Sequence, residues 1–119
     1  MKIYLAGPMR GIPEFNFPAF RAAAADLRAQ GHEVFNPAER DSLQFGEGFE
    51  KGNVTGSETL ATAQHGFSLR HALGGDLAWI CAEAEAIALL PNWERSTGAT
   101  AERAVALALG LEVIEVVGV

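Results

Sequence analysis

The residues whose types and spacing are suited to chemistry lie in two short segments at opposite ends of the chain. The first runs from Ile3 to Gly11 (IYLAGPMRG) and the second from Leu90 to Glu102 (LPNWERSTGATAE). Each is typical of a strand that enters a glycine-containing loop, and the second loop opens a helix with Glu102 in its predicted first turn. At the strand ends of a parallel sheet, such loops form a crevice suited to a small anionic or polar ligand.

The elements that must position these loops alternate along the chain. The predicted strands are apolar runs, at residues 2–6, 32–35, 86–90 and 111–117. The predicted helices have apolar residues at helical spacing, at residues 17–30, from 67 past 80, and at 99–109. This alternation predicts an α/β three-layer sandwich with a flavodoxin- or Rossmann-like parallel sheet of four strands. We expect the strand order 2-1-3-4, which brings the two loops side by side.

Two stretches interrupt the pattern. Residues 38–66 mix charge and glycine with little periodicity over a length unusual for a loop, so we expect a flexible or lid-like segment there. Gly74 and Gly75 each weaken the helix that begins at Phe67 by roughly 1 kcal/mol relative to alanine, which predicts a kinked or divided helix.

Composition limits the classes of function. A chain of 119 residues with 49% hydrophobic content fits one domain over residues 1–119. Its net charge of −6 and its scattered basic residues argue against a nucleic-acid polymer as partner. No apolar run approaches the ~20 residues of a membrane span, and the chain begins with a strand pattern rather than a secretory signal. We therefore expect a cytoplasmic protein with no membrane partner.

Metal and cofactor sites are not expected either. The single cysteine, Cys81, lies in an apolar helical stretch and is predicted to be a buried reduced thiol. His32, His65 and His71 lack the spacing of metal ligands. The sequence also contains neither a P-loop nor a G-x-G-x-x-G motif, so an NTP or dinucleotide site is not predicted.

Three separated motifs resemble the nucleoside 2-deoxyribosyltransferase superfamily. They are Tyr4-Leu-Ala-Gly-Pro-Met-Arg-Gly, Asp76 with Trp79, and Ser96-x-Gly98-x-x-x-Glu102. Within that superfamily the chain most resembles a phage- and prophage-associated branch of unassigned function. The second and third motifs are also similar to the 2'-deoxynucleoside 5'-monophosphate N-hydrolases.

The resemblance implies a double displacement at the anomeric carbon of a nucleoside. Glu102 matches the family's nucleophilic glutamate, Tyr4 the tyrosine that hydrogen-bonds it, and Asp76 the acid that assists departure of the base. The dipole of the helix is expected to keep Glu102 ionised while Asp76 carries the proton. The two carboxyls would act as in retaining glycosidases, with water or a second base as acceptor and no cofactor.

The resemblance also implies a substrate pocket. Ser96 stands where the transferases usually have aspartate and the hydrolases serine, which favours a 5'-monophosphate; Arg10 and the N–H groups near Gly98 would add donors. Trp93 is a candidate for stacking on the nucleobase. The candidate binding residues are Gly7, Met9, Arg10, Asn92, Trp93, Ser96 and Gly98.

Each of these residues also has a structural interpretation. Tyr4 would be a partly buried aromatic, Asp76 a helix N-cap after Gly75, and Glu102 a complement to the helix dipole. In the same way Ser96 would be a cap or turn residue, and Arg10 a solvated charge.

Two other functions fit the sequence. Pro8 stands where the hydrolases have serine, which favours a non-catalytic nucleotide-binding or sensing module. Alternatively, residues 38–66 would be the interaction surface of a helper or structural phage protein. The chain also lacks the C-terminal extension through which a neighbouring subunit often completes the family's pocket, so we expect a homodimer or higher homo-oligomer.

Overall fold

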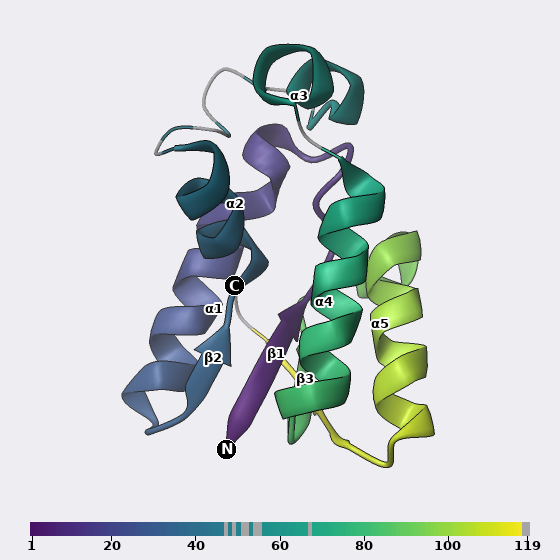
Figure 1. The fold of residues 1–119 in the computed structure, drawn as a ribbon. Coiled ribbons are helices and arrows are strands. Elements are labelled where there is room, and N and C mark those ends of the chain that lie inside the picture. The colour runs from purple at the N-terminus through teal and green to yellow at the C-terminus, as the bar shows by residue number, and fades with distance from the viewer. Residues whose placement is uncertain (47, 49, 51–52, 54–55, 67, 118–119) are drawn as a thin grey trace.

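Four parallel strands form one sheet at the centre of the molecule (Figure 1). The computed structural model describes residues 1–46, 48, 50, 53, 56–66 and 68–117. The strands are β1 (Lys2–Ala6), β2 (Glu33–Phe35), β3 (Ala86–Leu89) and β4 (Glu112–Glu115). Their order is β2-β1-β3-β4 and every pair is parallel, which confirms the predicted sheet.

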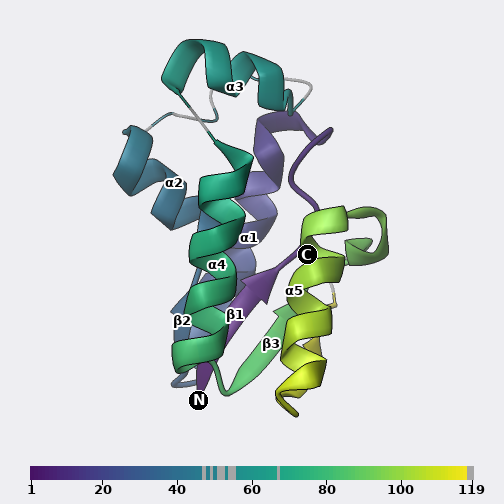
Figure 2. The same ribbon diagram turned by 45° about the vertical axis from the view of Figure 1, so that its right-hand side comes forward.

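Five α-helices and two short 3-10 helices connect the strands in the described part of the chain. The α-helices are α1 (Phe17–Ala29), α2 (Pro37–Phe45), α3 (Glu58–His65), α4 (Leu69–Glu83) and α5 (Thr97–Ala108). The 3-10 helices are η1 (Pro13–Asn16) and η2 (Trp93–Arg95). The views in Figures 1 and 2 place α1 on one face of the sheet and α4 with α5 on the other, so the fold has three layers.

Alternation along β1 divides its side chains between the two faces. Ile3 and Leu5 pack into the core that α1 covers, whereas Tyr4 and Ala6 pack into the core under α4 and α5. Tyr4 is therefore directed toward the two helices that carry Asp76 and Glu102. This register is what brings the candidate catalytic residues onto one face.

Serine side chains fix the starts of three helices. Each accepts a hydrogen bond from the main-chain N–H three residues on, which satisfies a donor that the first helical turn leaves unpaired. The three are Ser57 before α3, Ser68 before α4 and Ser96 before α5.

The stretch over residues 38–66 contains more regular structure than its sequence indicates. It holds nearly all of α2 and the whole of α3, so the expectation of three helices is wrong. Asn36 caps α2 by accepting from the N–H of Ala38, and Pro37 supplies a first helical residue with a preset φ. Residues 47, 49, 51–52 and 54–55 of this stretch lie outside the described residues, and its lid-like behaviour remains a prediction.

Helix α4 is continuous through Gly74 and Gly75. The predicted kink or division is wrong, because packing against the sheet and α5 outweighs the weak helix propensity of two glycines. The interpretation of Asp76 as an N-cap is wrong for the same reason, since Ser68 caps the helix. Phe67, where the sequence predicts the helix to begin, lies outside the described residues.

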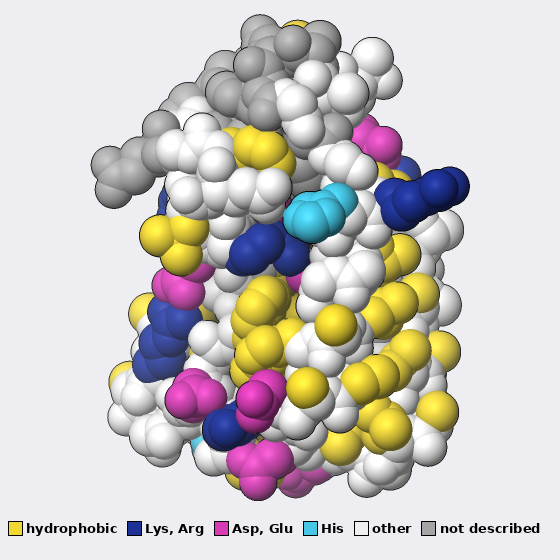
Figure 3. All heavy atoms as spheres, viewed as in Figure 1, with side chains coloured by type: hydrophobic (Ala, Val, Ile, Leu, Met, Phe, Trp, Pro, Cys, Tyr) yellow, Lys and Arg dark blue, Asp and Glu magenta, His cyan; other side chains and the backbone are white. Residues whose placement is uncertain are grey.

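The outer surface of α4 also corrects the prediction for Cys81. This thiol is exposed rather than buried, because Ile80 takes the inward position beside it. Hydrophobic side chains gather over α4 and α5 in the view of Figure 3. Within the described residues, no helix combines the length and apolar character needed to cross a membrane.

Candidate active site

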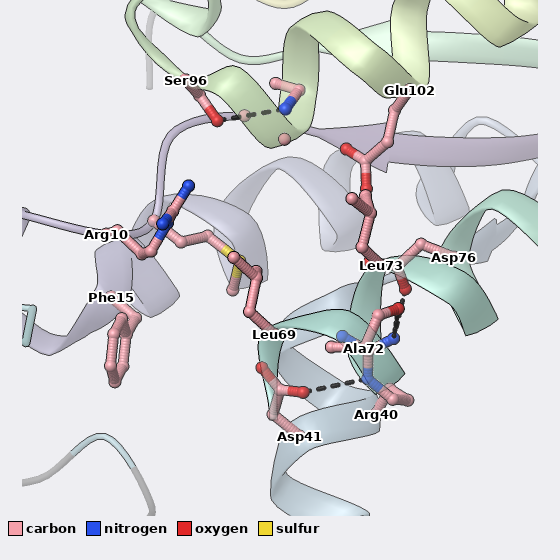
Figure 4. Close-up of a pocket in the computed structure, with 14 residues that line it drawn as sticks. Arg10, Phe15, Arg40, Asp41, Leu69, Ala72, Leu73, Asp76, Ser96 and Glu102 are labelled. Atoms are coloured by element: carbon pink, nitrogen blue, oxygen red, sulfur yellow. Dashed lines mark hydrogen bonds and ion pairs between the residues drawn. The ribbon is translucent and has the colours of Figure 1, made fainter. Parts of the chain in front are cut away.

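A cavity of about 80 Å³ opens where β1 and β3 end, bounded by the loops that follow them and by α2, α4 and α5 (Figure 4). Seven of the ten predicted site residues line it. They are Gly7, Met9, Arg10, Asp76, Ser96, Gly98 and Glu102. Tyr4 joins them through a hydrogen bond to Glu102, so the sheet order brings together residues that are almost a hundred positions apart in sequence.

Tyr4 and Glu102 form the innermost contact of the site. The Tyr4 hydroxyl donates to Oε2 of Glu102 over 2.6 Å. Burial, followed by the adjacent Glu102, raises the pKa of Tyr4 well above its ordinary value, so the phenol stays a donor. Its ring lies 5.5 Å from that of Phe35 and 6.3 Å from that of Trp79, which fixes the direction of the hydroxyl.

Glu102 differs from the sequence expectation in its charge. Its pKa is raised to about 8; burial is the largest cause, the hydrogen bond from Tyr4 opposes it, and the nearby Asp76 adds to it. The expected ionisation by the helix dipole is wrong because α5 begins at Thr97. Glu102 then lies in the second turn rather than the first, beyond the reach of the free N–H groups.

Asp76 is held by a cation that the sequence analysis missed. Arg40 on α2 donates from one terminal nitrogen to Oδ1 of Asp76, and its Nε donates to Oδ1 of Asp41 over 2.9 Å. All three line the cavity, and both aspartates are buried. Burial raises the pKa of Asp41 to about 6, against the opposing charge of Arg40. Figure 4 shows Arg40 between the two carboxylates.

A local signal for Arg40 was present in the sequence. Asn36-Pro37 followed by Glu39 is a helix-start pattern, with a capping side chain, a proline at the first position and an acidic first turn. A helix placed there would have directed attention to Arg40. The low periodicity of the residues after it obscured the signal.

The other end of the cavity carries Ser96 and Arg10. The Ser96 oxygen accepts from the N–H of Ala99 over 3.1 Å, so its interpretation as a helix cap is confirmed. Its hydroxyl hydrogen can still be donated to a ligand. Arg10 is partly exposed and donates to Oε1 of Glu58 over 3.0 Å and to Oγ1 of Thr97 over 2.8 Å.

Two predicted binding residues do not reach this cavity. The ring of Trp93 is covered by the guanidinium of Arg103, which lies 4.8 Å from the ring centroid. Asn92 lines an adjoining hollow together with Pro8, and this hollow shares Arg10 and Ser96 with the cavity. The structure thus places Asn92 beside Arg10 and Ser96, the two residues expected to bind a phosphate.

Gly7 has a steric role at the cavity rim. A Cβ atom at this position would lie 2.7 Å from Cβ of Leu90, closer than side chains approach. The glycine thereby lets the loop after β1 pass against the end of β3.

Two neighbouring carboxyls, one with a raised pKa and one beside a guanidinium, are suited to general acid–base or nucleophilic chemistry. The small cavity removes them from bulk water, which strengthens their electrostatic effect on a substrate. Among the described residues, no group of three or more His, Cys, Asp and Glu side chains is arranged to hold a metal ion.

The chain belongs to the family described as a domain of unknown function, DUF4406, whose model matches residues 1–115. No curated protein and no solved structure matches the chain.

Proposed function

We propose that the protein cleaves the N-glycosidic bond of a 2'-deoxynucleoside or its 5'-monophosphate, with Glu102 as the nucleophile. The contact of the Tyr4 hydroxyl with Glu102 beside Asp76 carries this proposal. The motifs that resemble the nucleoside 2-deoxyribosyltransferase superfamily contain these same three residues, and the cavity gives them a common space. The same resemblance associates the proposal with a phage or prophage origin. A cytoplasmic location is proposed beside it.

In the proposed reaction a Glu102 oxygen attacks C1' while the C1'–N bond to the base breaks. Asp76 donates a proton to the departing base, so that the base leaves neutral. The product of this step is a deoxyribosyl ester of Glu102, and Tyr4 steadies the carboxyl oxygen that does not form the ester bond. Water then gives hydrolysis, whereas a second base gives transfer, each with return of the proton to Asp76.

The hydroxyl of Ser96 and the guanidinium of Arg10 support a 5'-monophosphate as the substrate. Both border the cavity and the adjoining hollow, next to the start of α5. A phosphate placed there would meet a hydroxyl, a cation and the free N–H groups of the first helical turn. Pro8 does not supply the additional donor that a serine would give.

The direct test incubates purified protein with each deoxynucleoside and each deoxynucleoside 5'-monophosphate, modified pyrimidines included, and separates free base by liquid chromatography. We expect base release by the wild type and its loss in Glu102→Gln, which keeps an acceptor for Tyr4. Glu112→Gln serves as the matched control because Glu112 is exposed on β4. Base release that survives Glu102→Gln would overturn the assignment of the nucleophile.

One observation favours a non-catalytic nucleotide-binding module instead. Burial raises the pKa of Glu102 and Arg40 is paired with Asp76, and this arrangement favours neither an ionised nucleophile nor a proton on the acid. This alternative predicts saturable binding of a monophosphate by calorimetry together with no base release at about 1 mM substrate, a typical upper KM. Base release from any compound of the panel excludes it.

A further inference from the structure

The active site contains one cation to which the proposed reaction assigns no role. Arg40 lies between Asp41 and Asp76, with a different nitrogen directed to each carboxylate. A third contact, from Arg40 to the carbonyl oxygen of Ala72, spans 3.4 Å and ties the guanidinium to α4. About a fifth of the Arg40 side chain is exposed, so its charge acts mainly inside the site.

The contacts of Arg40 distinguish the two carboxyls of the pair. The charge of Asp76 disfavours the ionised form of Glu102 and helps to raise its pKa. The guanidinium of Arg40 donates a hydrogen bond to Asp76, whereas Glu102 accepts its hydrogen bond from the neutral hydroxyl of Tyr4. A guanidinium stabilises a negative charge on the carboxyl that it contacts, whereas a neutral hydroxyl does so less, which makes Glu102 the better place for the proton.

Among the described residues, the titratable groups that face Asp76 come from three elements. They are Arg40 and Asp41 from α2, Glu102 from α5 and Tyr4 from β1. Among them only Arg40 is a cation, and Asp41 is the one other carboxylate that it already contacts. A guanidinium that moves fully onto Asp41 would leave Asp76 as the better proton acceptor.

We propose that Arg40 is a positioning residue that keeps the shared proton on Glu102, and that its transfer to Asp41 releases this proton to Asp76. In the transfer, an O–H bond of Glu102 breaks and an O–H bond of Asp76 forms, with no other reactant. The result is an ionised nucleophile and a protonated acid, the pair that the reaction needs. The role of Arg40 in catalysis rests on the proposed function, whereas its effect on the location of the proton does not.

The proposal predicts opposite effects for two substitutions. Arg40→Gln removes the positive charge beside Asp76, so at neutral pH the proton moves from Glu102 toward Asp76. Asp41→Asn removes the second acceptor for the guanidinium, which then stays on Asp76 and holds the proton on Glu102. Arg40→Lys retains the positive charge and should keep most of the protons on Glu102.

The test is a carboxyl ¹³C NMR titration without nucleotide, with Asp and Glu carboxyl carbons labelled and signals assigned through Asp76→Asn and Glu102→Gln. We expect the wild type to show a protonated Glu102 and an ionised Asp76 at pH 7. Arg40→Gln should exchange these states in a substantial fraction of molecules, and Arg40→Lys should restore them. The proposal would be overturned by a proton on Asp76 in the wild type, or by an unchanged distribution of the proton between the two carboxyls in Arg40→Gln. If Arg40→Gln does not fold, the titrations of the wild type and Asp41→Asn decide the question.

A kinetic arm separates this proposal from the proposed function. If base is released, Asp41→Asn should lower kcat roughly 100-fold with little change in KM, the size of a general acid–base contribution, because the guanidinium can no longer leave Asp76. Arg40→Gln should not lower kcat, because it already moves the proton to Asp76, and Arg40→Lys should stay close to the wild type. Arg70→Gln, at an exposed position of α4, is the control that should leave kcat unchanged. The expected NMR distribution without any base release would refute the proposed function and leave the role of Arg40 intact.

Discussion

Glu102 is buried, and its raised pKa favours a proton at neutral pH, where a glutamate on the surface would be ionised. Its side chain has a tyrosine donor and an aspartate neighbour, and burial is the largest influence on its pKa. A buried carboxyl whose proton can be released locally is a common device for chemistry near neutral pH. The same property makes the stability of the protein depend on pH.

We predict that wild-type stability falls as the pH rises from about 4.5 to about 8. In this window the folded state holds a proton on Glu102 that the unfolded state has lost, so deprotonation favours unfolding. The slope for one such group is at most about 1.4 kcal/mol per pH unit. Glu102→Gln removes this contribution, so its free energy of unfolding, measured with urea, should depend less on pH above pH 6. At pH 8 the variant should be more stable than the wild type. Identical profiles for the two proteins would contradict the assigned protonation.

Ser96 has two roles that substitution can separate. Ser96→Ala should destabilise the protein by about 1 kcal/mol through loss of the cap, and Ser68→Ala should cost about the same. Ser96→Asp keeps a capping oxygen but places a negative charge beside the proposed phosphate. We expect Ser96→Asp to raise KM for the monophosphate on the order of tenfold or more while sparing the nucleoside, because hydrogen bonds to charged groups carry about 1.5–3 kcal/mol. Equal effects on both substrates would remove Ser96 from the phosphate site.

At the scale of elements, α4 shows how far tertiary packing overrides local propensity. The helix carries Asp76 toward the cavity and passes through two glycines without interruption. A Cβ atom built on Gly74 or Gly75 meets no described atom within 4 Å. The glycines are therefore not required by packing within the described chain.

Replacing either glycine with alanine should stabilise the protein by about 1 kcal/mol, because alanine restricts the unfolded chain and favours the helix. Chemical unfolding of Gly74→Ala and Gly75→Ala measures this directly. Gly7→Ala is the opposite control and should destabilise the fold, since its Cβ would overlap Leu90. Loss of stability in the α4 variants would indicate that this face is closely packed against another molecule.

At the scale of the whole molecule, exposed apolar side chains are consistent with the expected self-association. Leu107 and Leu109 at the end of α5 are each 48% exposed, Val113 on β4 is 36% exposed, and Val117 is 85% exposed. Strand β4 is also an edge of the sheet in the described residues. We expect light scattering to give a mass above that of a 12.6 kDa monomer, and a constant monomer mass at all concentrations would contradict a shared site.

Much of the fold was predictable because the periodicities of strands and helices show the order of elements along the chain, and that order limits how the strands can be arranged in the sheet. The apolar run at Ala86–Leu89 and the alternation of elements were enough to predict the strand order. The site was predictable where motifs name residues on β1, α4 and α5. A local helix-start pattern indicates the helix that carries Arg40 and Asp41, but their role could not be predicted, because it depends on how α2 docks against α4. The expected charge of Glu102 was wrong mainly because the depth of its burial depends on the tertiary structure, and also because α5 begins two residues earlier than predicted.

The proposed reaction requires a covalent bond between the sugar and Glu102. The most direct measurement is a rapid acid quench during reaction with a deoxynucleoside 5'-monophosphate, followed by intact-protein and peptide mass spectrometry. Trypsin should release Glu102 in the peptide Ser96–Arg103, which lies between two arginines. We predict that this peptide gains the mass of a deoxyribosyl phosphate in the wild type and gains nothing in Glu102→Gln. Base release with no adduct on this peptide, or with an adduct elsewhere, would contradict the account.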